Sequence, residues 1–234
     1  MTVKKNVWAI IPARGGSQGI KRKNIKKVNG IPLVVHAINQ AMSAKNIQNV
    51  LVSTEDIEIA EIAKNAGSKV MDRSDEFIND NSIQEVDRLL IWTVNKLIDN
   101  GEKVDVIVLL YPTAPLRKVS TIEDIVARII EEDCDSALTL YEDTTYLWAI
   151  NENGEPEPLN YDPKTRGPRQ KEKWNQWGEN KAVYAMTREL LLNTGCRLGG
   201  KIGWVEMSKL ESIDIDKKED LILCDVILKM NLID

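Results

Sequence analysis

Short apolar runs alternate with segments of helical periodicity along most of this chain. Strands are expected at residues 7–11, 50–54, 70–71, 104–111 and 136–140, where the runs have the length of buried strands. Helices are expected at residues 32–44, 57–66, 83–98, 120–132 and 217–230, with Ser82 and Ser120 as caps. This alternation implies right-handed crossovers and predicts an α/β fold with a mostly parallel, doubly wound, Rossmann-like sheet.

The pattern changes between residues 142 and 178. This stretch is rich in Asn, Pro, Glu and Trp and sustains no helical or alternating period. A segment of this length is too long for a plain connector inside a compact domain, so it is either functional or mobile. Strand character returns at residues 182–186 and 202–207. We therefore expect one domain, residues 1–234, with an insert at about 142–178.

Composition narrows the class of protein. The chain has 234 residues, of which 43% are hydrophobic and 29% charged, as in soluble globular proteins. No apolar run reaches the roughly 18 residues of a membrane span, and the N-terminus does not resemble a signal peptide. The three cysteines, Cys134, Cys196 and Cys224, are odd in number and widely spaced, which suggests neither a disulfide framework nor a zinc site. We expect a cytoplasmic protein without a membrane partner.

Charge is distributed unevenly along the chain. The net charge is −5, yet the first 54 residues hold nine Lys or Arg and no acid; the first acid is Glu55. An acidic protein with one concentrated positive segment is suited to a small anion, whereas a nucleic acid needs an extended basic face. The alternative is a solvated basic surface with an accidental pair of glycines.

The segment that follows the first strand has the composition of a polyphosphate loop. Gly15, Gly16 and Gly19 allow positive φ and let backbone N–H groups approach a ligand, and the adjacent cations of residues 21–23 repel one another unless an anion lies among them. The spacing fits neither the Walker A motif nor the dinucleotide fingerprint. A nicotinamide enzyme is therefore disfavoured, and the loop predicts a phosphate site at the carboxyl end of a first strand.

A second candidate site is the pair Asp214 and Asp216. If this stretch is a strand, residues two apart share a face, so the two carboxylates project together while Ile213 and Ile215 are buried. Such a pair repels unless it holds a hard cation such as Mg²⁺, which takes one or two carboxylates plus substrate phosphates. The alternative is that Asp216 caps the following helix, with Glu219 at capping-box spacing.

Several motifs together resemble the acylneuraminate, or CMP-sialic acid synthetase-like, cytidylyltransferases. The matching stretches are residues 12–24, 53–56, 112–117, 179–184 and 212–216, in family order and across nearly the whole chain. The first loop differs from that of the related keto-deoxy-octulosonate transferases. The resemblance therefore lies nearer the sialic, legionaminic or pseudaminic branch.

The resemblance implies that CTP and a nonulosonic acid react to give a CMP-sugar and pyrophosphate. It places Arg14 and Lys23 on the triphosphate and Asp214 and Asp216 on Mg²⁺. The expected catalytic residues are Arg14, Lys23 and Asp216. It also implies a homodimer formed through the segment of residues 142–178, which reaches the partner's site. The expected nucleotide-binding residues are Arg14, Gly15, Gly16, Ser17, Gln18, Arg22, Lys23, Asn24, Arg73 and Ser82, and the expected sugar-binding residues are Tyr111, Arg169 and Gln170.

Two positions depart from the family pattern. Gln18 stands where the family usually has Lys, so one phosphate cation is missing, and Arg22 is the neighbour expected to replace it. Tyr111 stands where the family commonly has a Gln that touches the sugar. The second change bears on the identity of the acceptor more than on the reaction.

The implied chemistry is attack of the anomeric hydroxyl on the α-phosphorus, which depends on positioning and charge neutralisation. An aspartate or a metal-bound hydroxide would take the proton. Two other functions stay open: a sugar-phosphate nucleotidylyltransferase of the same fold, such as a guanylyltransferase, and a non-catalytic nucleotide-binding module. His36, the only histidine, lies in a helical pattern and is expected to be structural.

Overall fold

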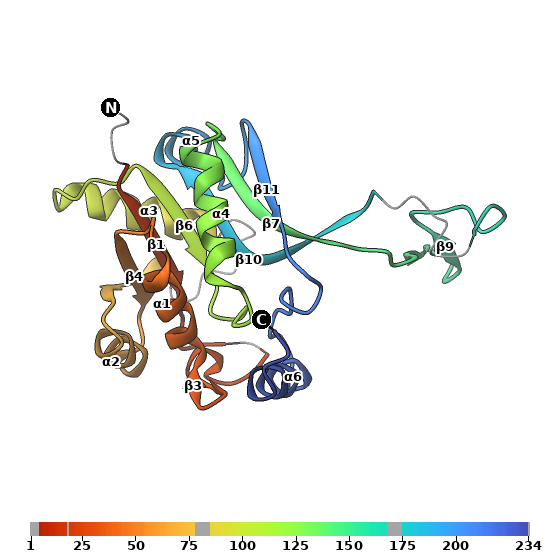
Figure 1. Cartoon of the computed structure of the whole chain (residues 1–234), viewed down its shortest axis with the longest axis horizontal. Helices are drawn as coiled ribbons and strands as arrows, with labels where there is room; N and C mark the ends of the chain where they lie inside the picture. Colours follow the sequence, from red (N-terminus) through yellow and green to blue (C-terminus); the bar gives the residue numbers. More distant parts are fainter. Residues whose placement is uncertain (1–4, 18, 78–84, 168–174, 234) are drawn as a thin grey trace.

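A seven-stranded mixed sheet forms the centre of the computed structural model, which describes residues 5–17, 19–77, 85–167 and 175–233 (Figure 1). Its strands lie in the order β11-β7-β10-β6-β1-β4-β5, and β10 runs antiparallel to both of its neighbours while the other paired strands are parallel. The predicted mostly parallel, doubly wound sheet is confirmed. Its strands are β1 (Val7–Pro12), β4 (Asn49–Thr54), β5 (Lys69–Asp72), β6 (Val106–Leu110), β7 (Ser136–Glu142), β10 (Trp177–Thr187) and β11 (Ile202–Glu206).

Helices cover both faces of this sheet because the central strands are apolar on both sides. In β1, Val7, Ala9 and Ile11 pack toward one helical layer, and Trp8 and Ile10 pack toward the other. The first layer holds α1 (Leu33–Ser43), α2 (Ile57–Asn65) and α4 (Val119–Ile130). The second holds α3 (Glu85–Asp99) and α5 (Arg188–Thr194).

A third apolar cluster closes the carboxyl edge of the sheet below β1. Here α6 (Lys218–Lys229) packs on the segment that follows β1, with Ile20, Leu116 and Ile215 between them. This cluster brings α6, near the end of the chain, beside the segment of residues 20–33 (Figure 1). The short elements of this region are η1 (Lys23–Ile25) and the hairpin of β2 (Lys27–Val28) and β3 (Ile31–Pro32), and η2 (Asp75–Phe77) follows β5.

The insert leaves the sheet as an arm between two paired strands. Glu142 of β7 pairs with Trp177 of β10, and the chain between them extends away from the body (Figure 1). The expectation of no regular structure here is wrong, because β8 (Trp148–Ile150) and β9 (Pro156–Pro158) form a small antiparallel sheet. Strands of three residues are too short for an alternating pattern to reveal.

Three further expectations are corrected. Residues 213–216 form no strand, although Ile215 N donates a hydrogen bond of 2.8 Å to Thr113 O. Ile215 is buried as expected, whereas Ile213 is only partly buried. Ser120 is not a cap, because α4 begins one residue earlier and Lys118 stands at its N-cap position. The hairpin β2–β3 and helix α5 were not expected, since both are too short to show a period.

None of the helices in the described ranges has the length and apolar composition that a membrane span needs.

Candidate active site

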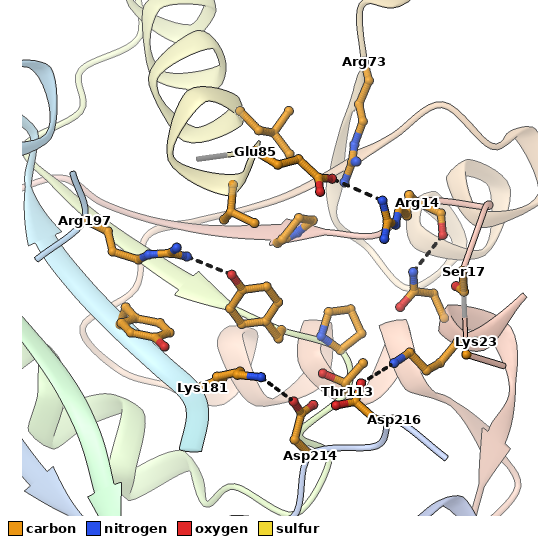
Figure 2. Close-up of a pocket in the computed structure, with 18 of the residues that line it drawn as sticks. Arg14, Ser17, Lys23, Arg73, Glu85, Thr113, Lys181, Arg197, Asp214 and Asp216 are labelled. Atoms are coloured by element: carbon orange, nitrogen blue, oxygen red, sulfur yellow. Dashed lines mark hydrogen bonds and ion pairs between the residues drawn. The ribbon is translucent and has the colours of Figure 1, made fainter. Parts of the chain in front are cut away.

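A cavity of about 610 Å³ opens at the carboxyl edge of the parallel strands (Figure 2). It lies at the end of β1. The next sheet strand in the sequence, β4, pairs with β1 on one side, and the later strand β6 pairs with it on the other. This reversal of strand order is the switch point at which open α/β sheets bind ligands. Because β10 is antiparallel, its first half reaches the same edge. The described lining residues are Pro12, Arg14, Ser17, Gly19, Lys23, Asn24, Arg73, Glu85, Val86, Leu89, Tyr111, Pro112, Thr113, Glu179, Lys181, Tyr184, Arg197, Asp214 and Asp216.

The glycines of the first loop are needed for close approach. Gly15 N donates a hydrogen bond of 2.7 Å to Glu55 Oε1, and a Cβ on Gly15 would lie 2.4 Å from the Asp56 carboxylate. A Cβ on Gly19 would lie 2.6 Å from the carbonyl oxygen of Asp216. Neither Gly15 nor Gly16 has a left-handed φ, so the expected use of positive φ at these two residues is wrong. The loop packs against the start of α2 and the chain before α6.

Two cations of this loop face the cavity. Arg14 Nη1 lies 3.4 Å from Glu85 Oε1, the first residue of α3, and Lys23 Nζ lies 3.1 Å from Asp216 Oδ1 (Figure 2). Asn24 is buried and its side-chain amide donates a hydrogen bond of 2.8 Å to Arg14 O, which fixes the backbone below the arginine. Arg14, Lys23 and Asn24 are thus brought together as the sequence predicted.

Arg22 points elsewhere. Its guanidinium lies 2.9 Å from Asp56 Oδ1 and 2.8 Å from Glu58 Oε2, and its backbone is left-handed at φ 56°. It is not among the described residues that line the cavity. The expectation that Arg22 replaces the cation missing at Gln18 therefore has no support in its position, because the side chain is directed at the start of α2.

Arg73, one of the nucleotide-binding residues that the family resemblance implies, lies in the cavity wall directly after β5. Its Nε and Nη2 donate to Ser53 O at 3.2 and 3.1 Å, and its side chain is 2% exposed. Burial lowers the pKa of Arg73, and the nearby carboxylates of Glu55 and Glu85 oppose that shift. The arginine is therefore a fixed, shielded donor at the rim opposite the aspartates.

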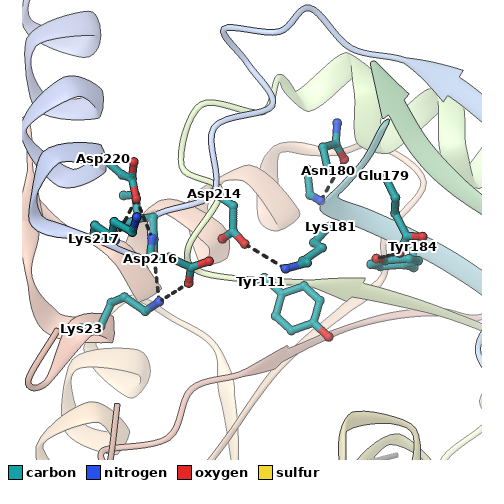
Figure 3. A network of polar contacts seen from close by, with 12 residues as sticks. Lys23, Tyr111, Glu179, Asn180, Lys181, Tyr184, Asp214, Asp216, Lys217 and Asp220 are labelled. Carbon is teal, nitrogen blue, oxygen red and sulfur yellow. Dashed lines mark hydrogen bonds and ion pairs between the residues drawn. The ribbon is translucent and has the colours of Figure 1, made fainter. Parts of the chain in front are cut away.

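Asp214 and Asp216 project into the cavity from the irregular chain before α6 (Figure 3). Asp216 does not cap the helix, because Asp220 accepts the hydrogen bonds from Asp216 N at 3.0 Å and Lys217 N at 2.8 Å. Lys181 Nζ lies 3.7 Å from Asp214 Oδ2. Burial raises the pKa of Asp214, and the negative charge of Asp216 adds to the rise.

This carboxylate pair fits a hard divalent cation. The two charges repel each other, and among the described residues each carboxylate has one lysine as its ion-pair partner, Lys23 for Asp216 and Lys181 for Asp214. The described ranges hold no group of three or more His, Cys, Asp or Glu that could bind a metal ion. A cation here would depend on Asp214 and Asp216 together with ligands from substrate and water, which is the usual mode of Mg²⁺.

The end of the cavity around Tyr111 is aromatic. Of the described residues at this end, Tyr111 alone was among the site residues expected from the sequence. Tyr111 accepts a hydrogen bond of 2.8 Å from Arg197 Nη1, and the Arg197 guanidinium lies 5.3 Å from the centre of the Tyr184 ring. Arg197 Nε also lies 3.1 Å from Asp87 Oδ1. The Tyr184 hydroxyl donates to Glu179 Oε1, and burial followed by this contact raises the pKa of Tyr184 strongly. A hydroxylated ligand would find both donors and acceptors at this end.

The remaining predicted residues divide into three groups. Ser17 lines the cavity, whereas Gly15 and Gly16 do not line it. His36 Nε2 lies 2.8 Å from Val28 O and outside the cavity lining, in line with a structural role. The candidates that lie outside the described residues are Gln18, Ser82, Arg169 and Gln170.

Four charged residues of the described lining were not predicted, namely Glu85, Glu179, Lys181 and Arg197. Glu179 and Lys181 stand in one of the matching motifs, and that was the available signal. Arg197 follows α5 with no motif around it, and only the packing of α5 on α3 brings it to the cavity. No sequence pattern could have found it.

Comparison with known proteins decides the family. The family model described as cytidylyltransferase matches residues 8–156. The chain belongs to the cytidylyltransferase family. The resemblance seen in the sequence motifs is thereby confirmed, and relatives bear the names of the same branch.

Two curated relatives differ in how much of their length the chain covers. It is 33% identical to N-acylneuraminate cytidylyltransferase A of Danio rerio over 91% of the chain and 48% of the relative. It is 29% identical to CMP-N,N'-diacetyllegionaminic acid synthase of Legionella pneumophila over 96% of the chain and 97% of the relative. The chain thus spans about half the length of the fish protein and nearly all of the bacterial one.

Solved structures show the same fold. CMP:2-keto-3-deoxy-manno-octonic acid synthetase complexed with CTP superposes with a TM-score of 0.73 at 16% identity, covering 97% of this chain and 100% of the other. 4-Diphosphocytidyl-2C-methyl-D-erythritol synthase from Anaerococcus prevotii superposes with a TM-score of 0.68 at 11% identity, with the same coverage. At these sequence identities the structural similarity establishes the fold of this chain but not its substrates.

Proposed function

We propose that this cytidylyltransferase transfers CMP from CTP to a nonulosonic acid and releases pyrophosphate. The observation that carries the proposal is the meeting of two opposite charge groups in one cavity: Arg14 and Lys23 on the loop after β1, and Asp214 and Asp216 before α6. Relatives named for sialic and legionaminic acids support the acceptor class. CTP is a cytoplasmic metabolite, and we place the reaction in the cytoplasm.

The two ends of the cavity suit the two substrates. The phosphates of CTP belong beside Arg14, Ser17 and Lys23, where backbone and side chains are both polar. Arg73, held on Ser53 O, lies at the rim where the base would be bound. The sugar belongs at the aromatic end, where the phenol ring of Tyr111 and the Tyr184 ring meet edge to face at 6.3 Å.

Asp214 and Asp216 are the residues that would hold Mg²⁺. When bound, such an ion supplies charge neutralisation for the phosphates and polarises them toward attack. Lys23 contributes a fixed positive charge next to Asp216 without any metal, because Ile215 O, at 2.6 Å from Nζ, anchors its ammonium. Arg14 is similarly held by Glu85.

The reaction joins the anomeric oxygen of the acid to the α-phosphorus of CTP and breaks the bond from that phosphorus to the bridging oxygen. Pyrophosphate leaves with the bonding electrons, and the hydroxyl proton passes to a base. We assign the role of this base to the Asp216 carboxylate. Its side chain is 64% exposed, against 22% for Asp214, so it is the more accessible of the two. Positioning and charge supply the rate enhancement, as in other phosphoryl-type transfers.

We also propose that the active form is a homodimer joined through the arm. The arm carries several exposed apolar side chains, Leu147, Trp148, Ile150 and Leu159, which a monomer leaves in water. Tyr161 packs against the rings of Tyr146 and Trp148, so the surface is ordered by aromatic contacts.

The test is a pyrophosphate-release screen of the four nucleoside triphosphates against sialic, legionaminic and pseudaminic acids. CTP with one of the three acids is expected to give Mg²⁺-dependent release. A parallel screen replaces the acids with sugar phosphates, and release there with GTP would instead favour a guanylyltransferase of the same fold. Binding of CTP without release for any acid would favour a nucleotide-binding module.

A further inference from the structure

Lys181 has an unusual backbone for a residue in a strand. Its φ is 57°, in the left-handed region, where the Cβ of an L-residue crowds the following carbonyl oxygen. Glycine fills such a position without that penalty. Three of the five non-glycine residues with positive φ in the described chain are Asn or Asp, which tolerate this region, and Lys181 is not of that type. A lysine here needs a reason beyond the turn itself.

The turn is a bulge in β10. The pairing of β10 with β7 shifts register between Glu179 and Tyr184, so the residues between them leave the regular ladder. Such bulges re-aim a side chain, often beside an active site. In this bulge the left-handed conformation of Lys181 directs its side chain into the cavity (Figure 3). The next two residues, Ala182 and Val183, are buried in the core.

Buried polar contacts hold the bulge on the side of Asn180. Its Oδ1 accepts a hydrogen bond of 2.6 Å from Thr139 Oγ1, and its Nδ2 donates one of 2.9 Å to Ser212 Oγ. Thr139 Oγ1 in turn accepts from Val183 N at 3.2 Å. Asn180 is 4% exposed, so these bonds are shielded from water and fix the backbone just before Lys181.

A buried cation holds the other side. Arg117 Nη1 donates a hydrogen bond of 2.7 Å to Ala182 O, and Arg117 Nε donates one of 2.8 Å to Gln40 Oε1. Burial lowers the pKa of Arg117 to about 9, and within the described ranges no acidic side chain pairs with it. Burying a guanidinium without a carboxylate partner costs free energy. The fold keeps Arg117 buried despite this cost, and the hydrogen bond to Ala182 O fixes the bulge. Strained backbone persists where its surroundings over-determine it, commonly at functional sites.

The Lys181 ammonium lies beside Asp214 on the side away from the phosphate cations. Nζ is 3.7 Å from Asp214 Oδ2, and Figure 2 shows Arg14 and Lys23 on the other side of the aspartate pair. The Lys181 side chain is 61% exposed, so an ion pair of this length contributes little to stability. The same ammonium becomes available to an anionic substrate when Asp214 engages a cation.

We propose that Lys181 binds the anomeric carboxylate of the acceptor acid. The inference rests on the proposed function. In a nonulosonic acid this carboxylate and the attacking hydroxyl are attached to the same carbon. A hydroxyl placed beside Asp214 and Asp216 therefore brings the carboxylate next to these residues. Two of the described cavity cations lie on the Tyr111 side: Arg197 is held by the Tyr111 hydroxyl and Asp87, whereas Lys181 is the one beside Asp214.

Lys181→Gly is the discriminating variant because glycine suits the backbone and removes the charge. The KM of the acid is expected to rise about tenfold or more, the loss of one charge-assisted hydrogen bond, while the KM of CTP changes less than about twofold. Tm is expected to stay equal or to rise by up to about 3 °C as the strained conformation is relieved. Lys181→Arg is expected to keep most of the acid affinity. Asp133→Gly is the matched control: Asp133 is also left-handed and exposed, lies outside the cavity, and should leave both KM values unchanged.

A second measurement removes the charge from the ligand. Equilibrium titration with the acid and with its methyl ester, in the presence of a non-hydrolysable CTP analogue, is expected to show a preference for the acid in the parent and none in Lys181→Gly. An unchanged acid KM and an unchanged preference would overturn the proposal, as would a rise confined to the KM of CTP. A parent that releases no pyrophosphate with any acid would overturn the proposed function as well, so the two failures are distinguishable.

Discussion

The ammonium of Lys23 lies 3.1 Å from the carboxylate of Asp216, a residue 193 positions further along the chain. This contact joins the phosphate loop to the aspartate pair and makes one site from two distant motifs. The hairpin β2–β3 and α6 pack together behind it, so the contact is supported by an apolar cluster.

Asp216→Asn is expected to nearly abolish Mg²⁺-dependent turnover while leaving Tm close to that of the parent. The amide keeps the shape but loses the charge that a hard cation needs, and the capping of α6 depends on Asp220 instead. Turnover as a function of Mg²⁺ concentration measures the effect. Asp225→Asn is the control and should keep normal Mg²⁺ dependence, because Asp225 lies on α6 outside the described cavity lining, with Lys229 and the Asn29 backbone as its partners. Normal turnover in a folded Asp216→Asn protein would refute the metal role.

Tyr111→Gln is expected to change which acid is preferred. The substitution removes a ring that contacts Tyr184 and a hydroxyl that accepts from Arg197, both at the sugar end of the cavity. The ratio of kcat/KM between two acids should shift by about tenfold, or about 1.4 kcal/mol of differential transition-state binding. Tyr111→Phe keeps the ring and should give a smaller shift. An unaltered ratio in Tyr111→Gln would place the sugar elsewhere.

Arg22→Ala is expected to weaken stability more than catalysis. If Arg22 replaced the cation missing at Gln18, as expected from the sequence, the variant would lose more than tenfold in kcat/KM and Gln18→Lys would rescue part of that loss. Since Arg22 pairs with Asp56 and Glu58 outside the cavity lining, we now expect less than a threefold change in kcat/KM and a destabilisation of about 1 kcal/mol. Steady-state kinetics and thermal unfolding decide between the two, and a tenfold kinetic loss at unchanged Tm would restore the first expectation.

The same variant should show a defined pH dependence. Burial alone would raise the pKa of Asp56, but hydrogen bonds from Ile59 N–H and the Arg22 guanidinium outweigh it and lower that pKa below 3.8. A lowered carboxyl pKa contributes stability that is present above the unfolded value and is lost as pH falls through the folded one. The Tm difference between parent and Arg22→Ala should therefore be full at pH 7 and shrink below pH 3.8. A difference that stays constant with pH would mean that the ion pair is not its cause.

Replacing residues 144–175 with a short glycine-rich linker is expected to convert a homodimer into a monomer. The deletion keeps the pairing of Glu142 with Trp177 at the base of the arm but removes the exposed apolar residues beyond it. Light scattering at micromolar concentration measures the change. A monomeric parent under the same conditions would contradict the proposed dimer.

Much of this molecule was readable from local patterns. The central strands, the long helices and the α/β class follow from apolar periodicity, because a buried strand must be apolar on both faces. The loop after β1 and the pair Asp214 and Asp216 were identified by residue types whose chemistry is specific even without a fold. The short elements, β8, β9 and α5, were missed because three to seven residues cannot establish a period.

The sequence by itself therefore determined the sheet-and-helix class and identified the glycine-rich basic loop after β1 and the two carboxylates, since each is encoded by neighbouring residues. Only the tertiary structure decided the partners of each charge: Arg22 on Asp56, Arg197 on Tyr111 and Asp87, and Lys181 beside Asp214. These pairs join residues far apart in the chain, and their geometry depends on the antiparallel course of β10 and the packing of α5 and α6. Such distances are set by the whole packed fold, and no local pattern contains them.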